Sequence, residues 1–128
     1  MRFLIDTHIF IWLFEKSDRL SRSANALLTD ANNEIFLSMA SIWEMQIKLD
    51  IKKIELDRPL SEIVALERRE NNLQILPIEL RHIYALSALP MHHRDPFDRL
   101  LLAQSNVETM PILSADAVFD RYGAKILR

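Results

Sequence analysis

Short apolar runs alternate along the chain with longer segments in which apolar residues recur every three or four positions. The short runs predict strands at residues 2–5, 34–37, 74–77 and 111–113, with a possible last strand at 125–127. The longer segments predict helices at residues 7–14, 21–30, 39–50, 60–71, 78–89, 96–107 and 115–122. Because parallel strands need crossover connections, this alternation predicts an α/β fold in three layers, with a central, mostly parallel sheet of four to five strands flanked by helices.

Acidic residues lie next to the predicted strand ends or helix starts. Asp6 directly follows the first strand, Asp98 lies in the first turn of the helix at 96–107, and Asp116 follows the fourth strand. In an open parallel sheet, ligands bind outside the carboxyl ends of the strands, so this fold would bring the three acids to one edge. A fourth acid, Glu44, lies among large apolar residues inside the helix at 39–50, where an unpaired charge is costly.

Three of these acids also have a purely structural explanation. Asp6 can cap the helix that follows it, and Asp116 can stabilise a helix dipole. Asp98 lies three residues after Asp95, and the pair resembles a capping box. Each explanation is sufficient for its own residue, so only the combination of acids favours a shared site.

Glu44 stands four residues before Lys48, which is the favourable order for a surface ion pair on a helix. If the four acids meet instead, two carboxylates about 4 Å apart repel by about 4 kcal/mol at an effective dielectric constant of about 20. Such a group needs a cation to stay ionised. All-oxygen ligation favours a hard ion, so Mg²⁺ or Mn²⁺ is expected.

The composition excludes several classes of site. The 128 residues, 49% apolar and 27% charged, predict one domain over residues 1–128 with a real core. A net charge of −2 is unlike that of a general nucleic-acid coat protein, but it does not exclude a nuclease. A single glycine excludes a Walker loop, a dinucleotide fingerprint and a G-x-S-x-G elbow, and the lack of cysteine excludes thiolate metal sites.

The amino terminus has an acid after three apolar residues, whereas a signal peptide needs a longer uncharged run. No uncharged apolar stretch approaches the roughly 18 residues that cross a bilayer. We therefore expect a cytoplasmic protein without a membrane partner.

The histidines and tryptophans are expected to be peripheral to the chemistry. The four histidines lack the i, i+4 spacing of a helical zinc site, and His92 and His93 are expected to be solvated or to face phosphate. Trp12 and Trp43 lie at helical spacing among isoleucine and leucine, which predicts packing in the core rather than stacking on bases.

Arg94 and Arg99 flank the predicted acidic site. They are candidates for binding the phosphates of a nucleic-acid backbone, which supply much of its affinity for proteins. Ion pairing with Asp95 and Asp98 is an equally good explanation of both arginines.

Four segments carry a family resemblance. They are residues 4–8 (LIDTH), 41–48 (SIWEMQIK), 89–104 with the HRDPFDRLLLAQ block, and 113–116 (LSAD) followed by Phe119 and Tyr122. In this order they resemble the PIN-domain family, in particular the VapC-like toxin nucleases of bacterial toxin–antitoxin pairs. That branch usually has a Gly-Lys-Leu turn after the glutamate helix, and residues 51–54 (IKKI) depart from it.

The resemblance implies a site and an activity. The family's acidic quartet, catalytic and metal-holding, corresponds to Asp6, Glu44, Asp98 and Asp116. Thr7 and Ser114 correspond to hydroxyls that orient these acids or a metal-bound water, while Asp95 adds to the acidic rim or only caps its helix. The implied activity is hydrolysis of RNA phosphodiester bonds by an endoribonuclease that uses Mg²⁺, with Mn²⁺ as a substitute.

The resemblance also implies two protein partners, a cognate antitoxin that covers the acidic groove and a second copy in a homodimer. Apolar residues in the first helix exceed what one buried stripe needs, and these are Ile9, Phe10, Trp12, Leu13 and Phe14. Such an excess marks an interface or completes the core, and the sequence favours neither.

Two other functions are weaker alternatives. A catalytically idle PIN-like module would bind RNA or a partner without cutting, but the intact acids argue against it. A receiver-like phospho-acceptor domain has adjacent acids after its first strand and an aspartate after its third. Here Asp6 has no acidic neighbour, and no aspartate follows Pro77.

Overall fold

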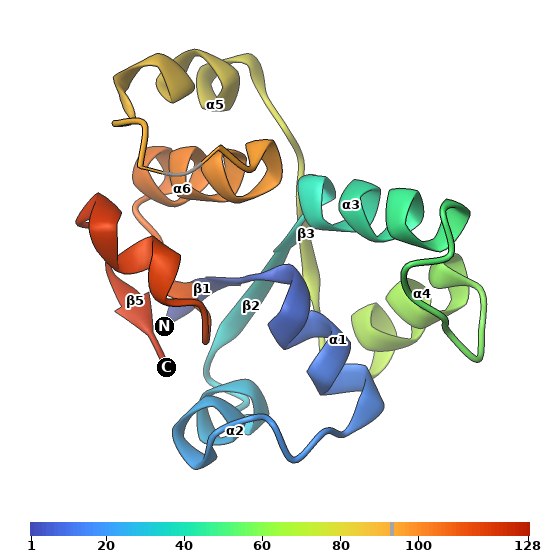
Figure 1. Cartoon of the computed structure of the whole chain (residues 1–128). Helices are drawn as coiled ribbons and strands as arrows, with labels where there is room; N and C mark the ends of the chain where they lie inside the picture. The colour runs from blue at the N-terminus through green and yellow to red at the C-terminus, as the bar shows by residue number, and fades with distance from the viewer. Residues whose placement is uncertain (93) are drawn as a thin grey trace.

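A parallel sheet forms the centre of the computed structural model, which describes residues 1–92 and 94–128 (Figure 1). Within these residues its strands are β1 (Arg2–Ile5), β2 (Glu34–Ser38), β3 (Gln74–Leu76), β4 (Ile112–Leu113) and β5 (Ile126–Leu127). The strand order is β3-β2-β1-β4-β5, and every neighbouring pair is parallel. The predicted sheet is confirmed, including its last strand.

Helices cover both faces of the sheet. They are α1 (Thr7–Glu15), α2 (Arg22–Thr29), α3 (Met39–Asp50), α4 (Leu60–Glu70), α5 (Leu80–Ala85) and α6 (Pro96–Glu108), with 3₁₀ helices η1 (Leu86–Ala88) and η2 (Ala117–Tyr122). The helix predicted at 78–89 is therefore a short α5 that tightens into a 3₁₀ turn. The helix predicted at 115–122 is entirely 3₁₀, the form that short pieces of helix often take.

Side chains of the central strand β1 alternate between two hydrophobic clusters. Phe3 and Ile5 pack into the larger cluster with residues of α1, α2, α3 and α4. Leu4 packs into the other cluster with residues of α6 and η2. This alternation is what a strand that is buried on both faces requires, and it confirms the three layers.

The order of the strands places a switch point at the carboxyl ends of β1 and β4. From β1 the chain moves through β2 to β3 on one side, whereas β4 and β5 lie on the other side of β1. Crossover connections leave in opposite directions from these two strands, so a crevice forms where they end. Asp6 follows β1 and Ser114 follows β4, so both residues lie at this crevice.

The two tryptophans differ in their packing. Trp12 is half-buried against the larger hydrophobic cluster, as predicted. The prediction for Trp43 is wrong, because its side chain is 59% exposed. The buried face of α3 is formed by Ala40, Ser41, Glu44 and Met45, and a residue at position 43 lies off that face at about 100° per residue.

The apolar excess in α1 completes the core. Ile9 and Phe10 are buried, and the remaining apolar residues of the helix pack against the larger hydrophobic cluster. Among the described residues, no helix is long and apolar enough to cross a membrane.

Candidate active site

The four acids singled out from the sequence line one cleft of about 220 Å³. Asp6 comes from the end of β1, Glu44 from α3, Asp98 from the first turn of α6, and Asp116 from the segment between β4 and η2. The other residues that line this cleft are Thr7, His8, Lys48 and Asp95. We call this hollow the acidic cleft.

Asp6 combines the capping role and a place in the acidic cleft. It is 4% exposed, its Oδ1 accepts a hydrogen bond from the Ile9 amide at 2.8 Å, and its Oδ2 accepts one from the Ser114 hydroxyl. Burial raises the pKa of Asp6 above its ordinary value, and the negative charge of Asp116 adds to the rise. The hydrogen bonds from Ser114 and Ile9, and the proximity of His8, oppose that rise. Burial therefore disfavours the charged form of this carboxylate, which a bound cation would stabilise.

Ser114 joins two of the acids at the switch point. Its hydroxyl donates to Asp6 and accepts a hydrogen bond from the Asp116 amide at 2.9 Å. The Asp116 carboxylate in turn accepts from the Val118 amide at 3.0 Å and caps η2. The chain after β4 is thereby held so that Asp116, although exposed, stays at the cleft.

Glu44 is held by two partners, one on each of its carboxylate oxygens. The Thr7 hydroxyl donates to Oε1 at 2.6 Å, and the Lys48 ammonium lies 3.1 Å from Oε2. The ion pair expected from the i, i+4 spacing is therefore present on a glutamate that is 8% exposed. Thr7 also begins α1 directly after Asp6, so one turn of chain positions two of the four acids.

Asp95 caps α6, as the sequence predicts. Its carboxylate accepts from the amides of Phe97 at 2.9 Å and Asp98 at 3.2 Å, and Pro96 takes the favoured first position of the helix. Asp95 also lines the acidic cleft, so capping and a place on the acidic rim occur together.

Arg99 contacts backbone carbonyls in this structure, and its contact with phosphate stays a prediction. Its guanidinium donates to the backbone carbonyls of Pro90 at 2.9 Å and Leu86 at 3.3 Å, which ties the segment before α6 to the helix. Arg94 is exposed, and its contact with phosphate stays a prediction. The ring of His92 lies edge to face with that of Tyr122, with ring centroids 5.4 Å apart. His93 lies outside the described residues.

The donor set of the acidic cleft fits a hard divalent cation. Five carboxylates line the cleft with one lysine and one histidine, so negative charge is in excess. Every candidate ligand atom among the acids is oxygen, which suits Mg²⁺ or Mn²⁺. The volume exceeds that of several waters, and Mg²⁺ usually keeps several waters of its own.

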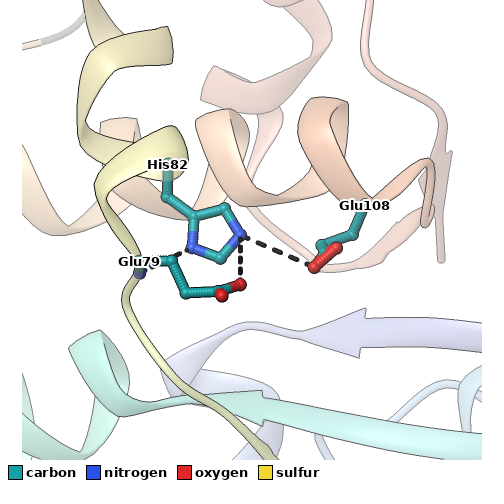
Figure 2. A group of neighbouring side chains, drawn as sticks. All are labelled: Glu79, His82 and Glu108. Carbon is teal, nitrogen blue, oxygen red and sulfur yellow. Dashed lines mark hydrogen bonds and ion pairs between the residues drawn. The ribbon is translucent and has the colours of Figure 1, made fainter.

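A second acidic group, which the sequence reasoning missed, lies between α5 and α6 (Figure 2). Glu79, His82 and Glu108 place ligand atoms within 4.8 Å of one another, and among the described residues this is the group whose distances suit direct binding of a metal ion. His82 is fully buried, and its Nε2 lies 3.6 Å from Glu108 Oε1 and 3.9 Å from Glu79 Oε1. We call these three residues the α5–α6 cluster.

Charge balance distinguishes the α5–α6 cluster from the acidic cleft. Arg81 Nη2 contacts Glu79 Oε1 at 3.0 Å and both carboxylate oxygens of Glu108, at 2.5 and 3.0 Å. His82 Nδ1 accepts the Glu79 amide at 3.0 Å, which puts the ring proton on Nε2 and leaves no lone pair there for a metal. The distances alone would admit a metal, but the chemistry favours a contact that holds α5 to α6.

Comparison with known proteins supplies the family. The pattern of the PIN domain family matches residues 3–125, so the chain belongs to this family. No curated protein sequence matches the chain at the significance required.

Solved structures share the whole fold. A chain of VapBC2 from Rickettsia felis, bound to a DNA fragment from its promoter, superposes with a TM-score of 0.74 at 16% identity, over 100% of this chain and 98% of that one. FitAcB from Neisseria gonorrhoeae superposes with a TM-score of 0.67 at 15% identity, over 100% of this chain and 97% of that one. VapBC-1 from nontypeable Haemophilus influenzae superposes with a TM-score of 0.68 at 14% identity, over 99% of this chain and 97% of that one. At these identities the likeness establishes the fold.

Proposed function

We propose that the chain is a metal-dependent endoribonuclease and the toxin of a toxin–antitoxin pair, acting in the cytoplasm. One observation carries the proposal: four acids far apart in sequence line one cleft at the switch point of a PIN-domain fold. The printed names of the structural neighbours, VapBC and toxin–antitoxin complexes, support the biological role.

Four acids of the cleft would hold Mg²⁺, or Mn²⁺ in its place. They are Asp6, Glu44, Asp98 and Asp116. When bound, such an ion supplies Lewis-acid activation of water and offsets charge on the phosphate. The Thr7 hydroxyl fixes the orientation of Glu44, and the Ser114 hydroxyl fixes that of Asp6. Lys48 lines the cleft with its ammonium 3.1 Å from Glu44 Oε2, and there it would contact a phosphate oxygen of bound RNA.

The proposed activity has a direct test in Asp98→Asn. The substitution keeps the size of the side chain but removes a charge from the acidic cleft, so RNA cleavage in Mg²⁺ should fall by at least about 100-fold. The matched control is Asp120→Asn, because Asp120 is an exposed aspartate whose partner is Arg128 rather than a residue of the cleft. EDTA should abolish cleavage by the unmodified chain. Cleavage by Asp98→Asn at the rate of the unmodified chain would contradict the assignment.

A second groove, which shares no lining residue with the acidic cleft, offers a concave surface to an antitoxin. This groove, of about 750 Å³, is lined by residues of α1, α2 and α4, including Phe14, Asn25 and Leu66. We propose that the antitoxin binds there and extends toward the acidic cleft. Copurification of the two proteins, lost on Leu66→Glu, would support this arrangement, while unchanged binding by that variant would place the antitoxin elsewhere.

We also propose a homodimer, and the exposed apolar residues of α5 rather than those of α1 would form its interface. Leu80, Ile83 and Tyr84 are exposed at i, i+3 and i+4, which places them on one face of the helix. Light scattering at micromolar concentration tests this, since Leu80→Glu should convert a dimer to a monomer. A clean monomer for the unmodified chain would contradict the dimer.

A further inference from the structure

An exposed tryptophan, in contact with a half-buried phenylalanine, adjoins two acids of the cleft in the sequence. Trp43 on α3 is 59% exposed, and its ring meets that of Phe97 on α6 edge to face, with centroids 5.3 Å apart and planes at 80°. Trp43 directly precedes Glu44, and Phe97 directly precedes Asp98. The pair therefore joins two helices at the point where each contributes an acid to the cleft.

Resting on the proposed nuclease function, we propose that Trp43, supported by Phe97, stacks on a nucleobase of single-stranded RNA next to the phosphate that is cut. Unpaired bases expose their π faces, and stacking on an aromatic side chain tightens binding about tenfold or more per base. A base paired in a duplex keeps its faces covered by its neighbours. Trp43 would thus position an unpaired strand over the acids and discriminate against duplex RNA.

The edge-to-face contact suits this role. Phe97 is half-buried and packs edge to face with the indole, which restricts the motion of Trp43 while much of the indole surface stays open to solvent. A restrained ring loses less conformational entropy when a base binds than a freely rotating one does.

The surroundings of Trp43 favour RNA over a protein partner. On the same side of α3 the exposed apolar surface continues to Met39 one turn earlier, but one turn later Gln46 is exposed and hydrogen-bonds to Asp50 at 2.9 Å. Two apolar residues are a short stripe for a helix interface and enough for one base. Exposed Lys52 and Lys53 follow the same helix, where they can attract a phosphate backbone.

The test compares Trp43→Leu with Trp43→Phe in steady-state cleavage of a single-stranded RNA with Mg²⁺. Loss of the aromatic face in Trp43→Leu should raise KM about tenfold or more while kcat changes less than about twofold, and Trp43→Phe should recover most of the affinity. Cleavage of the same sequence in a duplex should be slow for all variants. Ile51→Ala, an exposed apolar change at the end of the same helix, should leave KM unchanged.

The outcomes separate this inference from the proposed function. If the unmodified chain cleaves RNA and Trp43→Leu has the same KM, the stacking role is overturned and the nuclease stands. If Trp43→Leu alters the oligomeric state measured by light scattering and leaves the KM of the folded species unchanged, Trp43 belongs to an interface between copies, which also overturns it. If the unmodified chain neither binds nor cleaves RNA, both proposals fail. Thermal melting of each variant verifies that it is folded.

Discussion

The acidic cleft and the α5–α6 cluster are two groups of carboxylates in one chain, and they differ in how their charge is balanced. In the cluster, Arg81 contacts both carboxylates directly, and the buried ring of His82 lies between them and the backbone of α5 (Figure 2). In the acidic cleft, five carboxylates are lined up with one lysine and one histidine, and the lysine already contacts Glu44. The group whose ligand atoms lie within 4.8 Å of one another is thus one whose carboxylates already pair with an arginine.

The difference shows that distance alone does not identify a metal site. Carboxylates can approach closely when arginine pairs with them, and such a group has little left to gain from a cation. In the cleft the carboxylates outnumber the cationic side chains that line it, and burial together with the charge of Asp116 raises the pKa of Asp6, so a bound cation would stabilise its charged form. We therefore propose the cleft as the catalytic site and the cluster as the contact that joins α5 to α6.

The largest expected effect separates the two groups by activity. Asp116→Asn and Glu44→Gln each remove one charge from the acidic cleft, and RNA cleavage should fall by about 10²–10³-fold. Glu79→Gln makes the same chemical change in the α5–α6 cluster and should leave cleavage within about twofold. A large loss with Glu79→Gln, or none with Asp116→Asn, would reverse the assignment of the two groups.

The second prediction concerns the free energy of unfolding. His82→Ala removes a fully buried ring and its hydrogen bond with the Glu79 amide, so stability should drop by about 2–3 kcal/mol in a urea or thermal melt. The stabilisation that the folded protein gains on adding Mg²⁺ should be unchanged, because the cation is held elsewhere. Loss of that gain in His82→Ala would mean that the α5–α6 cluster holds the ion.

The third prediction tests the hydroxyl that joins two acids. Ser114→Ala removes the hydrogen bond to Asp6 and the one from the Asp116 amide, so activity should fall by about 10–100-fold. Stability should fall by about 1–2 kcal/mol. The control is Ser87→Ala, whose exposed hydroxyl donates to the Tyr84 carbonyl, and both quantities should stay near those of the unmodified chain. Equal activity and equal stability of the two serine variants would show that Ser114 has no role in the site.

The fourth and smallest prediction is the dependence on pH. The pKa of Asp6 is raised in the folded protein, so the metal-free fold binds that proton more tightly than the unfolded chain does. The stability of the metal-free protein attributable to Asp6 should therefore fall as pH rises from the ordinary aspartate pKa through the raised one. Over the same range the affinity for Mg²⁺ should rise, because the cation competes with the proton.

Asp6→Asn provides the control for this pH dependence. Asparagine keeps an oxygen to cap α1 at the Ile9 amide but has no carboxylate to titrate. Both trends should therefore be weaker in melts and in Mg²⁺ titrations of this variant. A pH response identical to that of the unmodified chain would show that another group is responsible.

The sheet and the position of the acids could be predicted because both depend on local patterns. Short apolar runs indicated the strands, and the parallel sheet that they form brings Asp6, Glu44, Asp98 and Asp116 to one edge. The capping explanations were also correct for Asp6 and Asp95, since a carboxylate at a helix start can cap and still have an oxygen that faces a cleft.

What the sequence could not supply depends on contacts between distant segments. Trp43 was placed in the core because its neighbours are apolar, and the direction of the buried face of α3 depends on how the helix packs on the sheet. Arg99 is held by carbonyls of the preceding loop, and Arg81 meets Glu108 across 27 positions in the chain. The one local signal for the α5–α6 cluster was a glutamate three residues before a histidine at the start of a helix.

The most direct test of the central claim is a crystal of the protein soaked in Mn²⁺, with anomalous scattering used to locate the ion. The account predicts an anomalous peak in the acidic cleft, among the carboxylates of Asp6, Glu44, Asp98 and Asp116, and none beside Arg81. A peak in the α5–α6 cluster with none in the cleft would contradict it.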